Sequence, residues 1–522
     1  MRPSKSGDTV ADALTESITY MKTIINYHAF SMTPPPELNV FITKYLRLGV
    51  FAASLAAIHT VCAQRTDLYN SNTGSDFSIN DGSSWHIGSY DGQVYAGSIN
   101  STNNNLHIQV VGNSSNIGQF SEAVTAHDIE YTIGSVDNHA WGKTLYFYGG
   151  AYATGGIEFY NNSGEYFVIQ LRGGNRTFTT DGDFSVNAAG SESDTADGSR
   201  MIIHSAQAGY QIGGDFNIGA RGRFYLSGSS TSSFSVSGVL NVNGGLDLAK
   251  HDSGGSGEKN ELIGGLSGIG RLQIGNTSTS HNLTFTNRGV SEFSGTYAAQ
   301  NGAGGKLNIT MNANSDAGRQ TLRFNTVADY SDERAFSAAD LGSVSVQWGE
   351  LNLGMHSGMG AGALSISGSS STFSVAGMDG NAEGGTARFA SLDWQGGTIR
   401  VDFTELSADR IDVAGELNVS SAADCALVLN VSAIDLGLWL EASEAPYLDY
   451  TILSFDAESS NLTLEMANEM LSHDGEINAQ ILEGDFANGL LTVRLGLVPE
   501  PATVAAILGA TALVFAIRRR AR

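Results

Sequence analysis

Paired carboxylates are the side chains of this sequence best suited to chemistry. Two Asp or Glu residues held about 5–10 Å apart can act as acid and base, or as acid and nucleophile, in glycoside hydrolysis. Four pairs are close in sequence: Asp181 with Asp183, Asp194 with Asp197, Asp332 with Glu333, and Asp409 with Asp412. Residues two apart on a strand share a face, but solvated acids in turns are the commoner outcome. We therefore assign no catalytic residue and expect a non-enzyme.

Motifs for metals and phosphates give no stronger signal. The sequence holds 11 histidines and 2 cysteines but no His-Glu-x-x-His motif, so zinc chemistry is not indicated. The segment Gly358–Gly362 resembles a phosphate loop only superficially, because it has no lysine and follows no strand-to-helix unit. Loops such as Asn80–Gly82 and Asp181–Asp183 offer oxygen ligands that suit calcium. We predict no cofactor and no metal site, with calcium chemically admissible at these loops.

Aromatic side chains in the first third of the chain could stack on sugars. The candidates are Trp85, Tyr90, Tyr95, Tyr146, Phe147, Tyr152 and Tyr160. Packing inside strands or caps usually takes most such side chains, and we expect about one in four to be free. A carbohydrate-binding surface module is therefore one alternative function.

The elements that position these residues are predicted to be strands. Apolar residues alternate with polar ones in several segments: Leu106, Ile108 and Val110; Phe167, Ile169 and Leu171; Phe184 and Val186; Phe216 and Ile218. This period of two is typical of half-buried strands. No amphipathic helical pattern of convincing length appears in the body, and the nearest helix-like stretches are around residues 335–340 and 464–471. The sequence therefore predicts an all-β fold.

Recurring strings favour a solenoid over a series of sandwiches or a barrel. The string Gly182–Asn187 recurs as Gly214–Gly219, and Gly228–Gly238 recurs as Gly368–Gly377. Units of about 20 to 35 residues suit the coils of a right-handed parallel β-helix, in which each coil buries its apolar row against the next. We expect these residues to point inward: Leu226, Phe234, Val236, Leu240, Val242, Leu246 and Leu248.

Composition limits the classes of partner. The formal net charge is -25, from 53 acidic and 28 basic residues, which argues against nucleic acid and against an anionic lipid surface. The chain has 64 glycines, 7 prolines and only 16% charged residues. Disordered chains usually have few aromatic and β-branched residues, whereas this chain places such residues at a regular period, so we predict that it is folded.

The segment from Val498 to Arg522 combines a motif, an apolar run and a basic end. Its parts are Val498, Pro499, Glu500 and Pro501, then the run Ala502–Ile517, then Arg518, Arg519, Arg520 and Arg522. An apolar run followed by arginines is typical of a single membrane-spanning helix whose basic end stays cytoplasmic. An ordinary tail anchor would have the same pattern.

The whole arrangement resembles the carboxy-terminal sorting signal of PEP-CTERM proteins, which are exported bacterial proteins handled by an exosortase. The resemblance covers about the last 25 residues. It implies a transient inner-membrane anchor, processing near the motif by an exosortase-type sorting protease, and delivery to the cell envelope, the cell surface or the extracellular matrix.

The amino-terminal region agrees with export. Basic residues at 44–47 precede the apolar segment 48–61, and Val61, Cys62 and Ala63 form a small-residue cleavage site before Gln64, which is typical of a secretory signal peptide read by the export machinery. More than 40 residues precede it, so we expect Met32 to be the true start and residues 1–31 to be a mis-assigned start or extension. Removal of the peptide would leave Cys425 as the last cysteine, without a disulfide partner.

Three segments of the body resemble the autotransporter-associated β-strand repeats of passenger-type β-helices. They are Gly265–Leu272, Asn282–Phe285 and Ser291–Tyr297. The resemblance implies a β-helical body, although the usual run of near-identical copies is missing.

Composition shifts divide the chain. From about Ser391 glycine thins, and longer strands are predicted at 427–431, 450–455 and 490–495. The predicted regions are 1–31, the extension; 32–63, the signal peptide; 64–150, an amino-terminal β region or cap; 151–390, the solenoid; 391–497, a carboxy-terminal β cap; and 498–522, the sorting signal.

These observations together predict a structural or adhesive protein, exported to the cell envelope or to an extracellular polysaccharide matrix. Extracellular polysaccharide is the expected polymer partner, and nucleic acid is excluded. The alternative classes are a β-helix enzyme acting on polysaccharide and the carbohydrate-binding module.

Overall fold

The computed structural model describes these residues: 65–72, 85–89, 91–110, 116–120, 122–134, 140–147, 150–163, 166–172, 177–189, 200–206, 209–226, 233–248, 256–274, 278–300, 305–325, 336–378 and 385–498. The chain divides into two units, 1–64 and 65–522, and every described residue lies in the second.

Several predicted features lie outside the described residues. They are the signal peptide with Val61, Ala63 and Gln64; Pro499, Glu500 and Pro501; the run Ala502–Ile517; Arg518, Arg519, Arg520 and Arg522; the pairs Asp194–Asp197 and Asp332–Glu333; the loop Asn80–Gly82; and Tyr90. Within the described residues, no helix is both long enough and apolar enough to cross a membrane.

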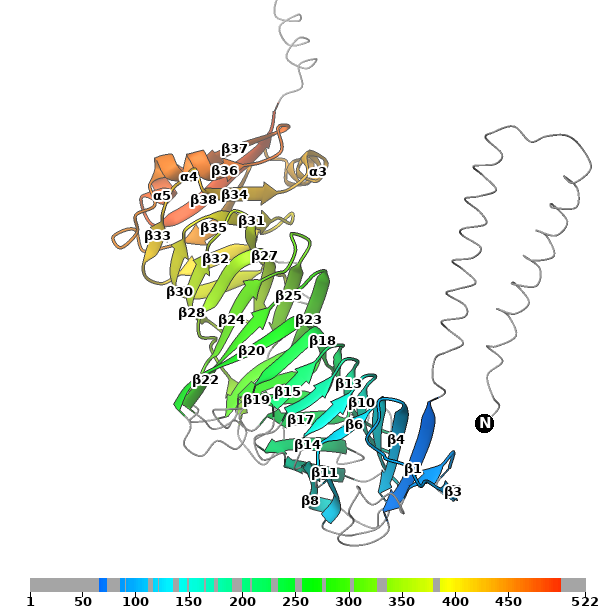
Figure 1. Ribbon diagram of the computed structural model, residues 1–522. Helices are drawn as coiled ribbons and strands as arrows, with labels where there is room; N and C mark the ends of the chain where they lie inside the picture. The colour runs from blue at the N-terminus through cyan, green and yellow to red at the C-terminus, as the bar shows by residue number, and fades with distance from the viewer. Residues whose placement is uncertain are drawn as a thin grey trace, which may run out of the picture. The chain divides into compact units, whose positions relative to one another are not determined.

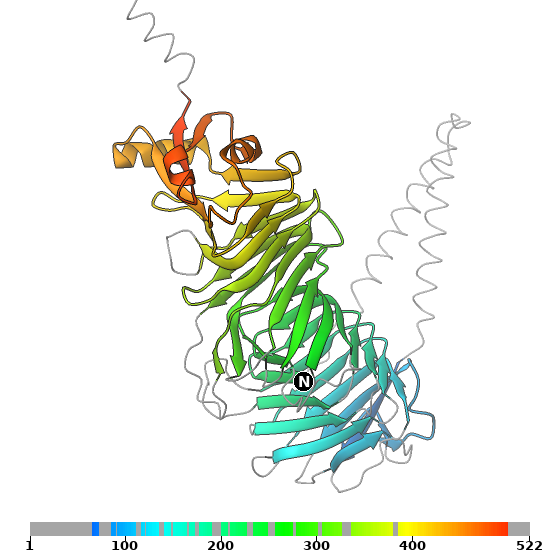
Figure 2. The ribbon, with the colours of Figure 1, turned by 90° about the vertical axis from the view of Figure 1, so that its left-hand side faces the viewer.

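Most described residues form strands, and most of those strands pair in parallel. The pairings make three ladders, and the chain passes from one ladder to another as it runs from coil to coil. Figure 1 and Figure 2 show the strands following one another in chain order, from blue to red. Parallel strands linked in this way are characteristic of a solenoid. The predicted all-β, solenoid-like fold of parallel strands is confirmed.

Ladder 1 consists of β1 Thr66–Asn72, β4 Asn104–Val110, β7 Asp128–Ile133, β10 Ile157–Asn161, β13 Phe184–Ala188, β16 Phe216–Ile218 and the second halves of β18 Phe234–Val242 and β20 Ser256–Ser267.

Ladder 2 consists of β6 Val124–Ala126, β9 Ala151–Ala153, β12 Thr177–Thr180, β15 Gly209–Ile212, the first halves of β18 and β20, β22 Ser278–Phe285, β24 Leu307–Asn312, the first half of β27 Val344–Met355, β28 Ala361–Ile366, β30 Thr386–Trp394, β32 Arg410–Val413 and β33 Leu417–Val419.

Ladder 3 consists of β5 Asn116–Phe120, β8 Ala140–Phe147, β11 Tyr166–Arg172, β14 Arg200–Ala206, β17 Gly222–Leu226, β19 Gly245–Leu248, β21 Arg271–Ile274, β23 Val290–Gln300, β25 Arg319–Asn325, the second half of β27, β29 Ser371–Val375, β31 Gly397–Asp402, β34 Cys425–Asn430 and β36 Leu471–Ser472.

Ladder 2 keeps its register over many coils. One column of directly paired residues runs through Val124, Ala151, Phe178, Tyr210, Phe234, Glu261, Leu283, Ile309, Val344, Leu364, Leu392 and Leu417. Neighbours in this column are from 20 residues apart, at Val344 and Leu364, to 35 residues apart, at Ile309 and Val344. The coil length predicted from the recurring strings is therefore the length observed.

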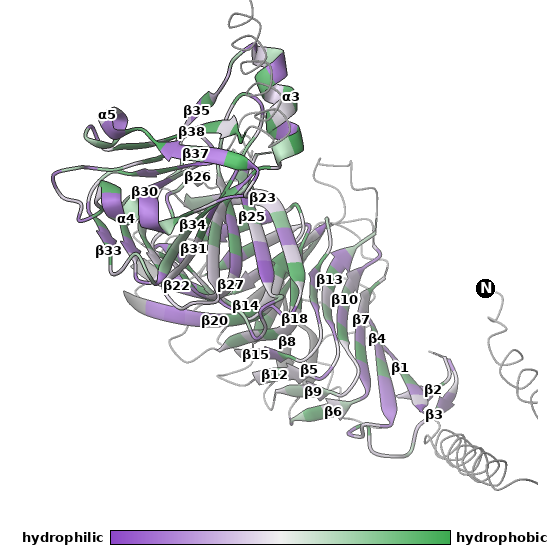
Figure 3. Ribbon diagram, turned by 90° about the horizontal axis from the view of Figure 1, so that it is seen from above, coloured by the Kyte–Doolittle hydropathy of each residue, from purple (hydrophilic) through white to green (hydrophobic). Residues whose placement is uncertain are grey.

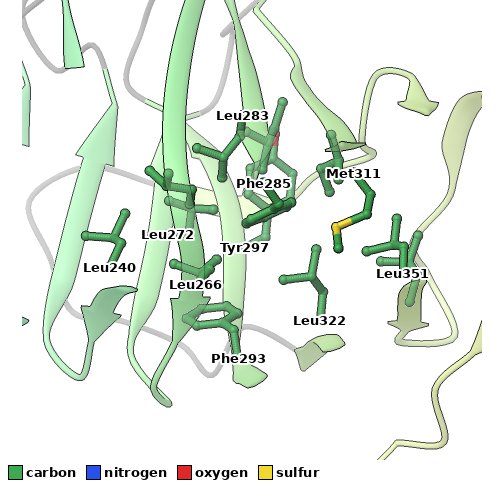
Figure 4. Packing of buried hydrophobic residues seen from close by; sticks show 14 of the residues in the cluster. Leu240, Leu266, Leu272, Leu283, Phe285, Phe293, Tyr297, Met311, Leu322 and Leu351 are labelled. Carbon is green, nitrogen blue, oxygen red and sulfur yellow. The ribbon is translucent and has the colours of Figure 1, made fainter. Parts of the chain in front are cut away.

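The core lies between the ladders and is filled by the inward side chains. Alternation is strict where one face is solvated, as in β7, where every second residue is buried, and Figure 3 shows apolar and polar residues interleaved along the strands. Side chains from successive coils meet in the interior, among them Leu240, Leu266, Phe285 and Leu322 (Figure 4). All seven predicted inward residues, Leu226, Phe234, Val236, Leu240, Val242, Leu246 and Leu248, are buried. Each fully buried leucine or phenylalanine contributes about 1.5–3 kcal/mol.

A buried ionisable pair, His281 with Glu261, lies within this largely apolar interior. His281 Nδ1 donates to Glu261 Oε1 at 2.6 Å, and both side chains are almost fully buried. A buried pair of this kind offsets its own desolvation only while both partners are present. In the ladder 2 column, Glu261 lies between Phe234 and Leu283, so a charged residue stands where the neighbouring coils have apolar ones.

Glycines allow the turns of successive coils to approach closely. A Cβ added to Gly182 would overlap the carbonyl oxygen of Gly155, and one added to Gly214 would lie 2.7 Å from the carbonyl carbon of Gly182. Backbone hydrogen bonds run through the same column, because Gly214 N donates to Gly182 O and Gly238 N donates to Gly214 O, each at 3.0 Å. Only a residue without a side chain fits such a turn.

The two recurring strings have different structural meanings. The string at Gly182 stacks in register on its copy at Gly214, with Phe184 paired to Phe216. In the second string Phe234 lies in ladder 2, whereas Phe373 lies in ladder 3. The strings at Gly228 and Gly368 are therefore not stacked copies of one coil position, and they are alike only because each contains a strand with two alternating inward apolar residues.

Antiparallel strands pair with both ends of the parallel array. At the amino-terminal end β2 His86–Ile87 pairs with β1 and with β3 Gln93–Val94. At the other end β35 Leu448–Ser454 pairs in parallel with β32, then antiparallel with β38 Leu490–Leu497, which pairs antiparallel with β37 Ile477–Ile481. Parallel pairing continues across residue 150, between β7 and β10, and across residue 391, between β29 and β31, where composition suggested boundaries. The strands predicted near 427, 450 and 490 are β34, β35 and β38.

Helices are few and lie near the carboxy-terminal end of the described chain: α3 Ala433–Ser443, α4 Leu464–Met470 and α5 Glu483–Phe486. The helix-like stretch near 464–471 contains α4, which begins after the capping residue Thr463. The helix-like stretch near 335–340 contains instead β26 Phe336–Ala338, paired antiparallel to β23.

Candidate functional site

One outward-facing position of ladder 1 carries a continuous line of polar side chains. We call it the outer row, and its members pair directly from strand to strand: Tyr69, His107, Glu130, Glu158, Ser185, Asn217, Asn241 and Ser267. In-register parallel strands put residues of equal offset side by side at the strand spacing of about 4.8 Å. Residues from eight different strands therefore form one surface line.

The charged end of the outer row centres on His107. Its Nδ1 donates to Glu130 Oε2 at 2.6 Å, its Nε2 lies 3.4 Å from Asp67 Oδ1, and its ring stacks on Tyr69 with centroids 4.5 Å apart. The hydrogen bond that His107 donates to Glu130 raises the pKa of His107, and the same bond lowers the pKa of Glu130. Each group thus favours the charged form of the other.

Two further groups of this end have raised pKa values. Partial desolvation by neighbouring coils raises the pKa of Glu158, and the charge of Glu130 adds to the effect. Desolvation, followed by the charge of Asp67, raises the pKa of Tyr69. The outer row therefore places Glu158, whose pKa is raised, beside Glu130, whose pKa is lowered, and next to His107. Perturbed pKa values of this kind occur at functional sites and in structural ion-pair networks.

The other end of the outer row is uncharged and bonds to itself. Asn241 Nδ2 donates to Asn217 Oδ1 at 2.7 Å, and Ser267 Oγ donates to Asn241 Oδ1. A parallel amide line recurs in ladder 2, where Asn282 Nδ2 donates to Asn260 Oδ1 and Asn308 Nδ2 donates to Asn282 Oδ1. These outward side chains hold adjacent coils together, which leaves fewer of their groups for a ligand.

A groove of about 300 Å³ crosses β28, β30 and β32 of ladder 2 and the adjoining strand β35. It is lined by Gly360, Ala361, Arg388, Phe389, Ala390, Asp412, Val413, Ala414 and Ser454. Asp412 Oδ1 accepts from Arg410 Nε and from Ser454 Oγ, each at 2.6 Å, and Arg388 Nε lies 4.0 Å from Asp412 Oδ2. These contacts place one carboxylate among a hydroxyl and two guanidinium groups along the groove.

Asp409, the other acid of this predicted pair, is turned away into the protein. Its side chain is 5% exposed and accepts from the backbone N–H of Gly385 at 3.0 Å and of Asp402 at 3.2 Å. Burial, with the charge of Asp402 as a further cause, raises the pKa of Asp409 to about 7. Asp409 and Asp412 therefore have separate environments and do not form the facing pair that glycoside chemistry needs.

Asp181 and Asp183 are likewise engaged by different groups. Asp181 Oδ2 accepts from the hydroxyl of Tyr152 at 2.7 Å, whereas Asp183 Oδ1 accepts from the backbone N–H of Asp215 at 2.8 Å. Asp215 repeats the arrangement one coil later by accepting from Val239 N at 2.7 Å. These acids join consecutive coils, and the loop Gly358–Gly362 borders the groove through Gly360.

The aromatic candidates are only partly available on the surface. Trp85 is fully buried, so its proposed place in a sugar-stacking platform is wrong, and Tyr95 packs against the core. Tyr152 and Tyr160 lie on outward faces, half-buried. Val498, the first residue of the sorting motif, is exposed and donates its N–H to Glu476 O at 3.0 Å.

The outer row was missed because its members are far apart in sequence. The signal was present: His107, Glu130 and Glu158 each directly follow an apolar inward residue, in Leu106–His107, Ile129–Glu130 and Ile157–Glu158. Aligning those strands on their inward residues would have put the three side chains in one line. Among the described residues, no cluster of three or more His, Cys, Asp or Glu side chains could hold a metal ion.

Comparisons with known protein families, with curated proteins and with solved structures find no match to this chain.

Proposed function

We propose that this protein is an exported, non-enzymatic structural or adhesive component of the cell envelope or of an extracellular polysaccharide matrix. The observation that carries the proposal is the in-register column from Val124 to Leu417. Its coils are further joined by outward amides and acids such as Asn241 and Asp183. A stack in which each coil contacts its neighbours gains stability from every interface, which suits a scaffold.

The route of delivery is the second part of the proposal. The run Ala502–Ile517 would form a single membrane-spanning helix with its arginines on the cytoplasmic side. Export machinery would act on the signal ending at Ala63, and an exosortase-type protease would process the chain near Val498–Pro501. The acidic charge of -25 supports a soluble body with no nucleic-acid partner.

Finer features of the fold belong to the same proposal. The coils would wind right-handed, since crossovers between parallel strands almost always do. The strands β35, β37 and β38, with the three helices, would act as a cap that prevents further strands from adding to the array.

Mapping both termini of the protein from its native cells, fraction by fraction, tests the delivery route. We expect a chain that starts at Gln64, ends near Pro501 and is found outside the inner membrane. A chain that still ends at Arg522 in the membrane fraction would contradict sorting and indicate a plain anchor.

Polysaccharide binding is the second candidate, and the groove at Arg388 favours it. A cation, a carboxylate and a hydroxyl spaced over successive coils could contact successive sugars of a polymer. Affinity electrophoresis in gels containing the matrix polymer tests this candidate. Retardation that Arg388→Gln abolishes and Arg323→Gln, a change outside the groove, leaves intact would support binding. Release of new reducing ends from the same polymer would instead favour the enzyme alternative.

A further inference from the structure

Helix α3 exposes apolar side chains beside the last described residues. Ile434 is 78% exposed and Leu438 is 59% exposed, and four-residue spacing puts both on one face of the helix. Leu497 and Val498, at the end of β38, are 42% and 46% exposed. We call these four residues the α3 patch. Large exposed apolar side chains gathered in one place usually mark an interaction surface.

The patch belongs to a well-anchored helix. Ser432 caps α3 by accepting from the backbone N–H of Asp435 at 3.0 Å. Leu436 is fully buried, and Trp439 and Leu440 pack partly buried against the core. The exposed face is therefore held in place by the buried one.

The α3 patch lies close to the point where the chain continues toward its apolar run. A Cβ on Gly437 would lie 3.5 Å from Leu497 Cδ1, so α3 and the end of β38 are in contact. Four residue steps separate Val498 from Ala502, and an extended chain covers at most about 14 Å in four steps. When the run enters a bilayer, the patch is within that reach of the lipid.

We infer that the α3 patch rests in the lipid interface of the membrane that the run Ala502–Ile517 enters. The inference rests on the membrane-anchored stage of the proposed function. Apolar side chains on one face of a helix bury themselves at the boundary between headgroups and acyl chains. The contact would fix the orientation of the solenoid's carboxy-terminal end and hold the sorting motif at the membrane surface.

The charges of α3 indicate which lipid it prefers. The helix has Asp435 and Glu441 but no lysine or arginine. Anionic headgroups repel such a helix, whereas a zwitterionic surface does not. The contact should therefore be apolar and should weaken as anionic lipid is added.

Fluorescence quenching in vesicles tests the inference with the full chain. The chain carries Cys62→Ala, keeps the buried Cys425, and is reconstituted in phosphatidylcholine vesicles containing lipids with a spin label near the headgroup. An environment-sensitive dye is attached at Leu438→Cys or, as control, at Ile269→Cys, which is 73% exposed and lies in the turn between β20 and β21. Thermal melts verify that both variants fold.

We expect the spin-labelled lipid to quench the dye at residue 438 at least about twofold more than the dye at residue 269. Replacing half of the lipid with phosphatidylglycerol should reduce that difference. Equal quenching at both residues, in vesicles from which the chain resists alkaline extraction, overturns the inference and leaves the proposed anchor standing. A chain that alkali extracts overturns both. The inference is also overturned if neither aqueous iodide nor the spin-labelled lipid quenches the dye at residue 438, because protein then covers the α3 patch.

Discussion

His107 and Glu130 are coupled so that each stabilises the charged form of the other. Because the pKa of His107 is raised above 6.5, its contribution to stability is full below that pH and is lost as the pH rises through the raised value. Because the pKa of Glu130 is lowered below 4.5, its contribution is full above that pH and is lost as the pH falls. The pair therefore stabilises the fold most between pH 4.5 and 6.5.

The variant His107→Gln should lower the melting temperature most within that window. The loss of unfolding free energy should not exceed about 1 kcal/mol, because the pair is partly exposed, and it should shrink as the pH rises through the raised pKa of His107. Melting curves at a series of pH values measure the effect, with Glu130→Gln as the partner control. A loss of equal size at all pH values would mean that His107 acts by stacking on Tyr69.

Asp409 should behave in the opposite way, because its raised pKa makes its charged form a cost to the fold. The cost is absent below its unfolded pKa near 3.8 and grows until the pH passes about 7. Asp409→Asn should therefore raise the unfolding free energy by on the order of 2–4 kcal/mol above neutral pH and change it little at acid pH.

Denaturant titrations at acid and alkaline pH measure the effect of Asp409→Asn. The matched control is Asp412→Asn, whose carboxylate is held by Arg410 and Ser454 and which should lose stability at neutral pH. Lower stability of Asp409→Asn at alkaline pH would show that Asp409 is needed as an anion.

At the scale of the element, the column of glycine turns sets how closely coils approach. Gly182→Ala should cost about 1–3 kcal/mol or more, because its Cβ meets the backbone of Gly155, which cannot move without displacing a strand. The matched control is Gly289→Ala, where no atom lies within 4 Å of the new Cβ. Chemical denaturation of both variants tests the difference, and equal stabilities would mean that the turns have room to separate.

Elements were predictable where burial follows a period of two. The inward residues Phe234 to Leu248 could be named in advance because alternation alone decides which face they occupy. Helix α3 could not, because Ile434, Leu436, Leu438 and Leu440 alternate with the period of a strand. Its helical state depends on the Ser432 cap, which is a local interaction with Asp435, and on packing against β38, which is a tertiary contact. The alternating apolar residues outweighed the local cap as a sequence signal.

The candidate site was less predictable than the fold for a related reason. Register between coils decides which polar residues meet, and coil lengths vary too much for sequence spacing to reveal it. His107 and Glu130 are 23 residues apart, and Asp409 and Asp412 only three, yet the first two touch and the second two do not.

At the scale of the whole molecule, each coil depends mainly on the coils that it contacts. Phe216→Ala removes a buried ring that touches Phe184 and Phe224, and should cost about 3–5 kcal/mol. Because each coil in such a stack is stabilised mainly by the coils next to it, the loss of stability should be concentrated in the coils that contact residue 216.

Hydrogen–deuterium exchange with mass spectrometry measures where that loss falls. Exchange should rise in peptides covering β13 to β18 and stay unchanged in β28 to β31. A uniform rise across all peptides would contradict local coupling and would show that the coils unfold as one cooperative unit.

The unequal spacing along the ladder 2 column has a consequence for how such a gene can evolve. Coils of 20 and of 35 residues hold the same register, so inserted or deleted residues at the corners leave the stacked strands intact, and lengthening a loop adds little entropic cost. Related chains can therefore diverge in length at every corner while conserving only the inward residues, and new surface specificities can arise without a new fold.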